Sequence, residues 1–404
     1  MNEKGKKICI ITHSHLCRNP RVLKEAICLS KAGYCVTILN GTYSEELTEQ
    51  DQSLIKDTGI TMLPVFSLQK SGPRSYVYRL VKRLSGILVK KFDFQLPSSL
   101  GYASWHFLSL ALRQKADLYI CHQEIGLYCG TQLIKGKKKV AFDFEDWYSE
   151  DLLGYAQKER PIRLLRKLEK IALQQGAFCF TPSDAMSSRL ALVYKARIPL
   201  TISNSFDLDE TILVNNKKFN SPIKLFWFSQ TIGPGRGLEN FLSMLNNIEF
   251  GLEVHLLGEI SADYKKELRN LMRGQHNIQF HPLVKPGELA AKIAEFDIGL
   301  ALEQKELPSR DVTVTNKFFQ YALSGLPIII SPSAGQVKIS GDQPPGFLLD
   351  DSLSTDQAAR LESWLRSEVD LQKARARAIT FARQYCWQKE SDKLLKAVNQ
   401  YDKM

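Results

Sequence analysis

The sequence predicts an α/β protein with two Rossmann-like, doubly wound domains that face a central cleft. Short apolar runs, such as those at 8–12 and 223–228, are bounded by turn residues and alternate with helical patterns. The chain has 404 residues, of which 44% are hydrophobic, so it is long enough to bury two cores of this kind. The polar segment 207–221, rich in Asn and Lys, separates the two series of elements, and we expect the domain boundary there.

The first series begins with a strand, a polar loop and a helix. The helix is expected over 20–31, because Pro20 stands in its opening turn and Gly33 follows its end. The loop lacks Gly-x-Gly-x-x-Gly, which counts against a nicotinamide or flavin cofactor. The same patterns predict strands at 35–39, 118–121, 139–143, 177–180 and 200–203, and helices at 97–115, 125–134, 163–174 and from 183 onward.

The second series repeats the alternation. A glycine-rich loop, 229–237, lies between its first strand and a helix that begins at 238. The remaining elements are strands at 253–257, 277–280, 297–301 and 327–330, and helices at 286–294, from 356 onward and at 387–401. No run approaches the ~20 apolar residues that span a bilayer.

Composition indicates a cytoplasmic protein with an anionic partner. The eight cysteines never form Cys-x-x-Cys and mostly lie inside apolar runs, so we expect reduced thiols and no metal cluster. The formal net charge is +11, and residues 1–210 carry +9 of it, from 30 Lys and Arg against 21 Asp and Glu. The partner of the first domain is therefore expected to be negatively charged.

The stretch 311–336 carries the strongest functional signal. It combines a loop, a short helix that Thr315 or Asn316 can cap, a tight Gly-Leu-Pro turn and a buried strand. A helix N-terminus at the carboxyl edge of a parallel sheet binds anions, because its free N–H groups and its dipole point outward. Lys317, near the start of this helix, would complete a site for a diphosphate.

The residues from Asn316 to Pro327, NKFFQYALSGLP, resemble the donor-binding segment of retaining GT-B glycosyltransferases, the group 1 or GT4-like family. The resemblance implies a glycosyltransferase that binds a nucleotide sugar in its second domain and needs no metal and no cofactor. It implies transfer to a glycan or lipid-linked acceptor on the first domain. It also implies domains at 1–205 and 206–386, with a terminal helix at 387–404 that crosses back to the first domain.

The same resemblance indicates the residues of the donor site. The family places a Gly-Arg pair and then a Lys-Gly pair in the glycine-rich loop, where Gln230 stands at the arginine and Arg236 at the lysine. The family often has two glutamates where this chain has Val312 and Gln320, so acids upstream are candidates to replace one of them. The predicted donor site consists of Gln230, Gly235, Arg236, Gly237, Glu303, Glu306, Thr315, Asn316, Lys317 and Gln320.

The acceptor side is expected in the first domain. Arg18 and Arg21 lie in a segment similar to the first loop and helix of the family and could face an acceptor phosphate, and His13 precedes them in the same loop. The strand end beginning at Asp143 is also similar to a family segment. Glu145 in this segment is therefore the candidate for acceptor contact or proton transfer.

A second polar strand end contains His122, which we take as a further catalytic candidate. A lone histidine at a strand end can instead be structural.

Residues 70–91 predict a basic amphipathic helix. The stretch contains seven basic and no acidic residues, together with an apolar stripe formed by Val77, Leu80, Val81, Leu84, Ile87 and Leu88. Such a helix can lie on an anionic membrane, which would make the protein peripheral on the inner membrane face. Alternatively, the stripe packs on the domain core. The stretch lacks the exposed aromatic residues that stack bases, so we expect no nucleic acid partner.

Two other function classes stay open. A sugar-nucleotide epimerase on the same fold would need acid and base residues on both sides of a sugar carbon, which Glu303, Glu306 and His281 could supply. A non-catalytic protein that binds an anionic membrane or a glycan would fit the missing glutamates and the basic first half.

Overall fold

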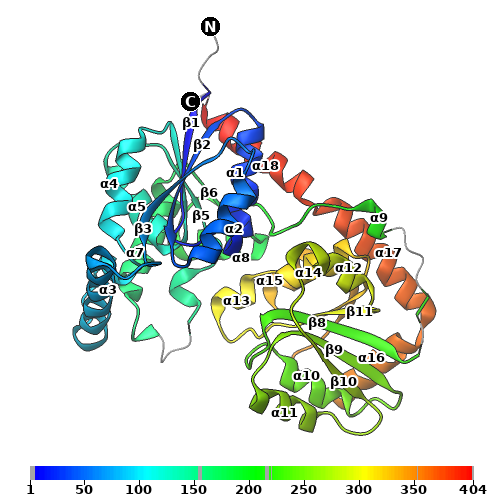
Figure 1. Ribbon diagram of the computed structural model, residues 1–404. Coiled ribbons are helices and arrows are strands. Elements are labelled where there is room, and N and C mark those ends of the chain that lie inside the picture. Colours follow the sequence, from blue (N-terminus) through cyan, green and yellow to red (C-terminus); the bar gives the residue numbers. More distant parts are fainter. Residues whose placement is uncertain (1–4, 153–156, 214–217, 220, 353, 403–404) are drawn as a thin grey trace. The chain divides into compact units, whose positions relative to one another are not determined.

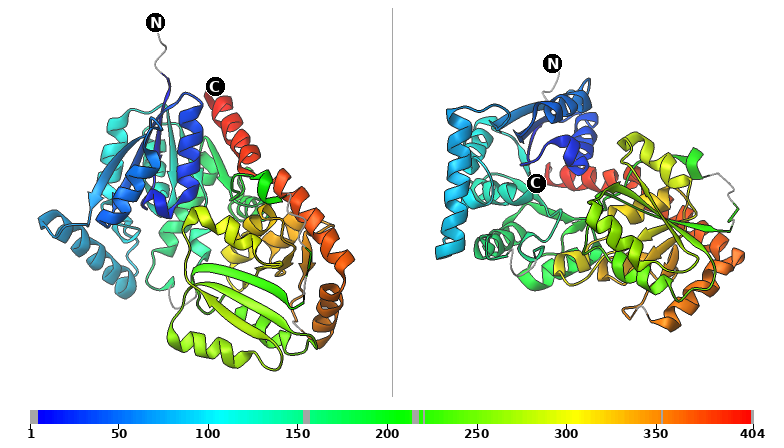
Figure 2. Two further views of the ribbon diagram at one scale, coloured as in Figure 1. Left: turned by 45° about the vertical axis from the view of Figure 1, so that its right-hand side comes forward. Right: turned by 60° about the horizontal axis from the view of Figure 1, so that its bottom comes forward.

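The computed structural model describes residues 5–152, 157–213, 218–219, 221–352 and 354–402. The chain divides into two compact units, one formed by residues up to Ile202 and from Ser391 onward, the other by Ser203–Glu390. We call these unit 1 and unit 2. Each unit is a parallel sheet with helices on both faces, which confirms the two predicted Rossmann-like domains (Figures 1 and 2).

Unit 1 contains a seven-stranded parallel sheet in the order β3-β2-β1-β4-β5-β6-β7. Its strands are β1 (Lys7–Ile11), β2 (Cys35–Thr42), β3 (Thr61–Ser67), β4 (Leu118–His122), β5 (Val140–Asp143), β6 (Phe178–Thr181) and β7 (Leu200–Thr201). Its helices are α1 (Pro20–Lys31), α2 (Glu45–Ile55), α3 (Pro73–Phe92), α4 (Ser104–Gln114), α5 (Gln123–Lys135), α7 (Ile162–Gln175) and α8 (Asp184–Tyr194), with single 3-10 turns at Leu16–Arg18, Pro97–Ser99 and Tyr148–Glu150. The strand order reverses between β1 and β4, so the crevice for a ligand is expected at their carboxyl ends.

Unit 2 contains a six-stranded parallel sheet in the order β10-β9-β8-β11-β12-β13. Its strands are β8 (Ile223–Thr231), β9 (Leu252–Glu259), β10 (Asn277–His281), β11 (Ile298–Ala301), β12 (Ile328–Ile330) and β13 (Gly346–Leu348). Its helices are α9 (Glu210–Leu213), α10 (Leu238–Leu245), α11 (Ala262–Leu271), α12 (Leu289–Ala294), α13 (Pro308–Val312), α14 (Asn316–Leu323), α15 (Ala334–Ser340), α16 (Thr355–Arg366) and α17 (Glu368–Gln384), with a 3-10 turn at Pro286–Glu288. Here the order reverses between β8 and β11.

Alternating side chains of the unit 2 strands build a core on each face of the sheet. Leu225 and Trp227 of β8 belong to one hydrophobic cluster, while Phe226 and Phe228 belong to the other. This is the pattern expected of a strand that is buried on both faces. Several helices begin at a serine whose hydroxyl accepts a backbone N–H, for example Ser261 from Tyr264. Local capping and two-sided burial therefore explain the regular α/β alternation.

The structure differs from the sequence predictions at three connections. The helix predicted over 97–115 is a 3-10 turn followed by α4, with Ala103 in a left-handed conformation between them. The helix predicted over 286–294 is likewise a 3-10 turn before α12. The segment 207–221 contains the short helix α9. In the first two cases the apolar pattern continues across a local break that periodicity does not detect, whereas α9 is too short for a periodic pattern to predict.

The last helix, α18 (Trp387–Asp402), is divided between the two units. Its residues up to Glu390 belong to unit 2, and those from Ser391 onward belong to unit 1. Its final part packs on unit 1: the ring of Tyr401 lies 5.0 Å from that of Phe178, and Asn399 accepts a hydrogen bond from the Tyr34 hydroxyl. The two units meet in sequence at 202/203 and 390/391, a few residues from the expected boundaries at 205/206 and 386/387. None of the described helices combines the length and apolarity that a bilayer crossing requires.

Replacing Gly299 by Ala is expected to destabilise unit 2. A Cβ at this position in the central strand β11 would lie 2.2 Å from the ring of Tyr321, which is fully buried. Overpacking of this kind typically costs about 1–3 kcal/mol. The midpoint of urea unfolding should fall accordingly, whereas Gly233→Ala, which adds a Cβ with nothing within 4 Å, should change it little. Equal midpoints for both variants would contradict this packing.

Candidate active site

A basic site lies at the carboxyl edge of the unit 2 sheet, where β8 and β11 are neighbours and their following loops diverge. The loop after β8 contains Gly235 and Gly237 with φ of +77° and +78°, a conformation that favours glycine. Gly237 also stands at the N-cap of α10. The two glycines therefore let this loop turn tightly and start α10 beside the crevice.

Two arginines share one carboxylate in this site. Arg236 Nη1 lies 3.4 Å from Glu303 Oε2, and Arg310 Nη1 lies 3.9 Å from Glu303 Oε1. Arg310 also donates a hydrogen bond of 3.0 Å to the carbonyl oxygen of Gly235. The Glu303 side chain is only 7% exposed, while those of the arginines are 41% and 31% exposed. The cluster carries a net positive charge near the surface.

Lys317 adds a third cation, held against aromatic rings. Its Nζ lies 4.8 Å from the ring centroid of Trp227 and 5.9 Å from that of Phe228. Burial, opposed by Glu303 and assisted by Arg236, lowers the pKa of the Lys317 ammonium to about 8. An anion that bound beside Lys317 would stabilise its charged form.

The start of α14 leaves its first N–H groups without a side-chain cap. Thr315 occupies the N-cap, but its side chain is instead within 3.4 Å of Gln336 Oε1. Asn316 is exposed in the first turn. Unsatisfied helix N–H groups and the dipole attract negative charge, so this helix start complements Lys317. The cap predicted at Thr315 or Asn316 is thus at Thr315 by backbone position, but not by a side-chain hydrogen bond.

Beside this site lies a cavity of about 130 Å³ in unit 2. Its lining includes Gly237, Glu303, Glu306, Ser331 and Ser333. The buried Ser333 hydroxyl has no hydrogen-bond partner among the described residues. The cavity therefore combines acceptors and hydroxyls of the kind that bind sugar hydroxyl groups.

The structure brings together five of the ten predicted donor-site residues, and Thr315 and Asn316 directly precede one of them, Lys317, at the start of α14. Gly235, Arg236, Gly237 and Glu303 meet as described, and Lys317 lies within the electrostatic range of Arg236 and Glu303. Gln230 and Glu306 are exposed, and the Oε1 of Gln320 is buried without a described hydrogen-bond partner.

Sequence reasoning missed Arg310 and Trp227 in this site. Arg310 looks like an ordinary solvated charge in a loop, and Trp227 looks like one more apolar residue of a strand. Only the structure shows that Arg310 lies beside Glu303 and Trp227 beside Lys317.

In unit 1, the polar strand ends of β4 and β5 enclose a buried ion cluster. Arg21 donates to both carboxylate oxygens of Asp143 and, at 2.7 Å, to the carbonyl of Ile202. Burial opposes the charge of Arg21, but Asp143 and Glu25 outweigh it and raise its pKa. Arg21 was expected to face an acceptor phosphate; instead it is buried and neutralised inside the domain. Arg18 is exposed.

His122 lies fully buried in the same cluster. Its Nδ1 is 3.0 Å from Glu145 Oε1 and its Nε2 is 3.2 Å from Glu25 Oε2. Burial opposes protonation of this ring, but the surrounding carboxylates outweigh it and raise the His122 pKa well above its usual value. His122 therefore acts as an imidazolium that holds Glu145. The Glu145 side chain is 17% exposed and also accepts two hydrogen bonds from Asn19 Nδ2, at 2.9 and 3.0 Å.

His13, predicted on the acceptor side, is enclosed by aromatic residues. Its Nε2 accepts the backbone N–H of Tyr102 at 3.0 Å, and its Nδ1 is 2.8 Å from the Tyr43 hydroxyl. Burial, with a smaller effect of Lys82, lowers the His13 pKa to about 4. Because both ring nitrogens are engaged, neither has a lone pair available to take a proton from a substrate.

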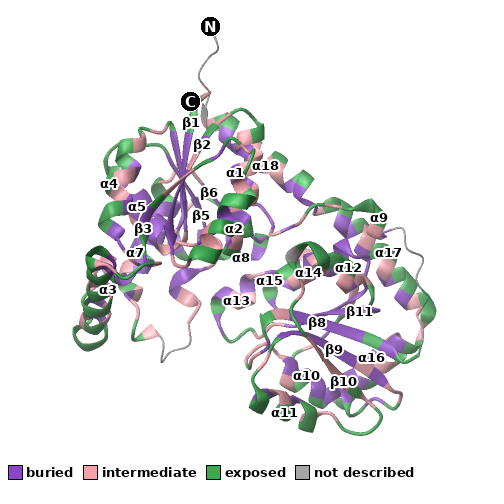
Figure 3. Cartoon of the chain, viewed as in Figure 1, coloured by how far each residue is buried: buried purple, intermediate pink, exposed green. Residues whose placement is uncertain are grey.

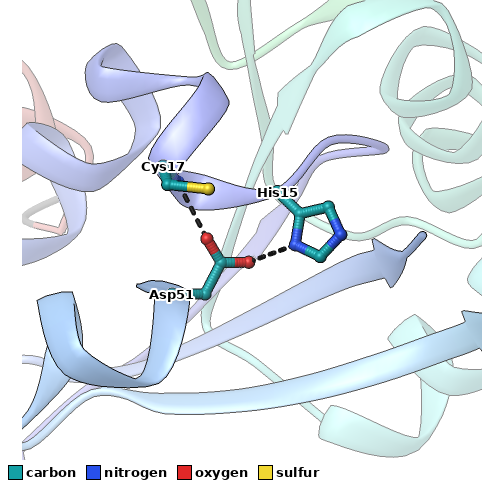
Figure 4. A group of neighbouring side chains, drawn as sticks. All are labelled: His15, Cys17 and Asp51. Atoms are coloured by element: carbon teal, nitrogen blue, oxygen red, sulfur yellow. Dashed lines mark hydrogen bonds and ion pairs between the residues drawn. The ribbon is translucent and has the colours of Figure 1, made fainter. Parts of the chain in front are cut away.

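His15, Cys17 and Asp51 lie close enough to resemble a metal site (Figure 4). However, His15 Nδ1 is 2.7 Å from Asp51, its Nε2 accepts the N–H of Tyr43 at 2.8 Å, and the second Asp51 oxygen accepts the N–H of Cys17. Burial and Asp51 raise the pKa of the Cys17 thiol to about 12, so the thiol carries its proton in this arrangement. The group fits a brace that ties α2 to the loop after β1.

No family model and no curated protein sequence matches the chain, but its fold matches solved glycosyltransferase structures. HepE of Anabaena, solved with UDP and glucose, aligns with a TM-score of 0.65 at 14% identity over 98% of this chain and 100% of that chain. Sucrose-phosphate synthase of Thermosynechococcus elongatus aligns with a TM-score of 0.70 at 14% identity, over 98% of this chain and 98% of that chain. The apo form of the lipopolysaccharide outer core galactosyltransferase WaaB aligns with a TM-score of 0.65 at 10% identity, over 98% of this chain and 99% of that chain. The chain therefore has the GT-B fold.

The titration of Lys317 tests the geometry of the basic site. Glu303→Gln should lower the Lys317 pKa below about 8, because a stabilising carboxylate is lost, whereas Arg236→Gln should raise it, because a repelling cation is lost. Glu306→Gln, which removes an exposed acid, serves as the control. NMR of isotopically methylated lysines measures the three pKa values. Shifts of the same sign in the two main variants would contradict the arrangement.

Proposed function

We propose that this protein is a glycosyltransferase that moves a hexose from a nucleoside-diphosphate sugar to an acceptor. The observation that carries the proposal is the group of three cations, Arg236, Arg310 and Lys317, at the topological switch point of unit 2. They stand beside an uncapped helix start and a cavity with hydroxyl and carboxylate groups. A diphosphate fits the cations, and a sugar fits the cavity.

In this mechanism the cations stabilise the charge that grows on the leaving diphosphate. Lys317 and the guanidinium groups are fixed before the reaction by aromatic rings and by Glu303, so little reorganisation is needed. We propose that these cations and the amide groups of α14 take the part that a divalent metal plays in other transferases. Retention of configuration and membership of the GT4-like group rest on the sequence resemblance of 316–327.

For the donor we propose UDP-hexose. The HepE structures that share the fold hold UDP, UDP with glucose, and UDP-glucose. The preference for this nucleotide is our inference from that likeness.

On the acceptor side we propose that Glu145 contacts the acceptor hydroxyl. Its carboxylate is partly exposed and is held by Asn19 and by the imidazolium of His122. His122 is a positioning residue in this scheme, because its own side chain is fully buried. His13 has no part in proton transfer, since both of its ring nitrogens are already engaged.

Lys317→Ala is expected to weaken the binding of UDP-glucose at least about tenfold, since a charge-assisted hydrogen bond contributes roughly 1.5–3 kcal/mol. Isothermal titration calorimetry measures the affinity, and Lys285→Ala, which removes an exposed lysine of unit 2, is the control.

The affinity of the wild-type protein for UDP-glucose should also fall as the pH rises through about 8, because unliganded Lys317 then loses its proton.

Unchanged affinity and unchanged sugar release in Lys317→Ala would refute the donor-site assignment. Incubation with a UDP-sugar and no acceptor separates the epimerase alternative: appearance of an epimer would replace the transferase proposal.

We further propose that the acceptor is a lipid-linked oligosaccharide or another envelope glycan, and that the protein contacts the cytoplasmic face of an anionic membrane through residues 70–91. Helix α3 supports this contact. Its buried residues are Ser75, Tyr78, Ser85 and Val89, and two members of the apolar stripe, Val81 and Leu88, are half-buried. Val77, Leu80, Leu84 and Ile87 are instead 51%, 55%, 50% and 41% exposed. Most of α3 is accordingly exposed in Figure 3.

The charges of α3 complement an anionic surface. Arg79, Arg83, Lys90 and Lys91 are exposed on the same helix as the outward stripe, and each cation near such a membrane contributes about 1 kcal/mol. Tyr76, Phe92 and Phe94 are 68%, 64% and 53% exposed around it, so the expectation that 70–91 has no exposed aromatic residue is wrong at Tyr76. Apolar residues that point to solvent beside a row of cations fit the interface of a bilayer.

Replacing Leu80 and Leu84 together by Ser should weaken binding to vesicles that contain phosphatidylglycerol about tenfold or more, because two insertable side chains are lost. The matched control replaces Leu192 and Val193, which are 71% and 47% exposed on α8, by Ser. Co-sedimentation measures the bound fraction. Equal binding of both double variants, or binding that is indifferent to salt and to lipid charge, would rule out α3 as the contact.

A further inference from the structure

A second site lies in unit 1, in a cavity of about 270 Å³ beside the carboxyl ends of β1 and β4. Its lining includes His13, Ser14, Gln123, Tyr148 and Arg160. His13 is neutral, and the Gln123 side chain is engaged by Ser14 and by the N–H of His13. Most of the cavity wall is thus polar but uncharged, and its character depends on the charged groups at its rim.

The cavity lining also contains Arg160 and the carboxylate of Glu124, and a second cation, Lys82, is hydrogen-bonded to the carbonyl of Ser99, which precedes the lining residue Leu100. Arg160 Nη2 pairs with Glu124, while its Nε is buried and has no hydrogen-bond partner among the described residues. Lys82 donates to the neutral carbonyl oxygen of Ser99 and forms no ion pair with any residue that the structure describes. One charge of the pair of cations is therefore left without a counterion.

The two cations repel each other. Burial, with a smaller contribution from the charge of Arg160, lowers the Lys82 pKa to about 8. Burial also lowers the Arg160 pKa. The field of Lys82 reaches His13 in the cavity wall. Two part-buried cations that repel each other are stabilised when an anion lies between them.

We infer that Lys82 and Arg160 form an anion site in unit 1 that takes the phosphate group of a phosphate-linked acceptor. The inference rests on the proposed transferase function and names the chemistry of its acceptor. Guanidinium and ammonium groups are the usual protein partners of phosphate oxygens, and the hydroxyls of Ser14 and Tyr148 stand in the adjoining cavity.

The position of Lys82 favours a phosphate that is attached to a lipid. Lys82 lies on the side of α3 that carries Tyr78, Ser85 and Val89 toward unit 1, whereas Leu80 and Leu84 point outward. If the outward stripe rests on a bilayer, the Lys82 backbone lies within about 12 Å of that bilayer, the diameter of a helix, so its long side chain is in reach of a phosphate that anchors a glycan there. The sequence predicted that Arg18 and Arg21 face an acceptor phosphate. The site inferred from the structure instead uses Lys82 and Arg160, which the sequence did not indicate.

Hexyl phosphate, hexanol and inorganic phosphate test the site by calorimetry with the full chain and no sugar nucleotide. We expect hexyl phosphate to bind and hexanol not to bind. Arg160→Gln and Lys82→Gln should each lose about tenfold or more in affinity, and Lys170→Gln, an exposed lysine on α7, should not. Tighter binding of hexyl phosphate than of inorganic phosphate supports a lipid-linked ligand; equal binding supports a site for the phosphate group alone.

Two further measurements distinguish a failure of the anion site from a failure of the proposed donor site. Arg160→Gln should raise the Lys82 pKa measured by NMR, because the repelling cation is gone, and this holds with no ligand present. UDP-glucose affinity reports unit 2 separately: if it is retained while hexyl phosphate binds no better than hexanol, the anion site is wrong and the donor proposal stands. Unchanged hexyl phosphate affinity in both variants would overturn the site as well.

Discussion

The candidate site of unit 2 depends on one interaction, the contact of the Lys317 ammonium with the faces of Trp227 and Phe228. Aromatic faces attract a cation without neutralising it, so the lysine remains charged but is destabilised by burial, as its lowered pKa records. A carboxylate in the same place would satisfy Lys317 and close the site to an anion. Glu303 instead bridges Arg236 and Arg310 and fixes these two cations nearby.

Unit 1 uses its charges in a different way. Arg21, Glu25, His122 and Asp143 are buried together, and their charges largely compensate each other. Breaking such a group leaves an uncompensated buried charge, which is costly, so its first role is to fix the ends of β4 and β5. Glu145 is the member that reaches solvent. The cluster thereby connects the core of the domain to one partly exposed carboxylate, in the way that supporting groups orient a reactive one.

Sequence patterns among neighbouring residues predicted individual helices and turns correctly. The start of α1 at Pro20, the four-residue spacing of α14 and the turn after Gly325 are properties of neighbouring residues, and the structure has these elements. Pairings across the fold were not predictable: Arg21 meets Asp143, 122 residues away, and Arg236 meets Glu303, 67 residues away. The apolar stripe of α3 shows the same limit, because helical periodicity identifies a face but not whether that face points inward or outward.

A crystal structure of the protein with UDP would show directly whether unit 2 binds the donor. The diphosphate should lie within hydrogen-bond distance of Lys317 Nζ, of at least one of the guanidinium groups of Arg236 and Arg310, and of the first N–H groups of α14. The Lys317 side chain should remain against Trp227. A diphosphate bound away from these groups, or a well-ordered structure at saturating UDP with these positions empty, would contradict the assignment of unit 2 as the donor-binding domain.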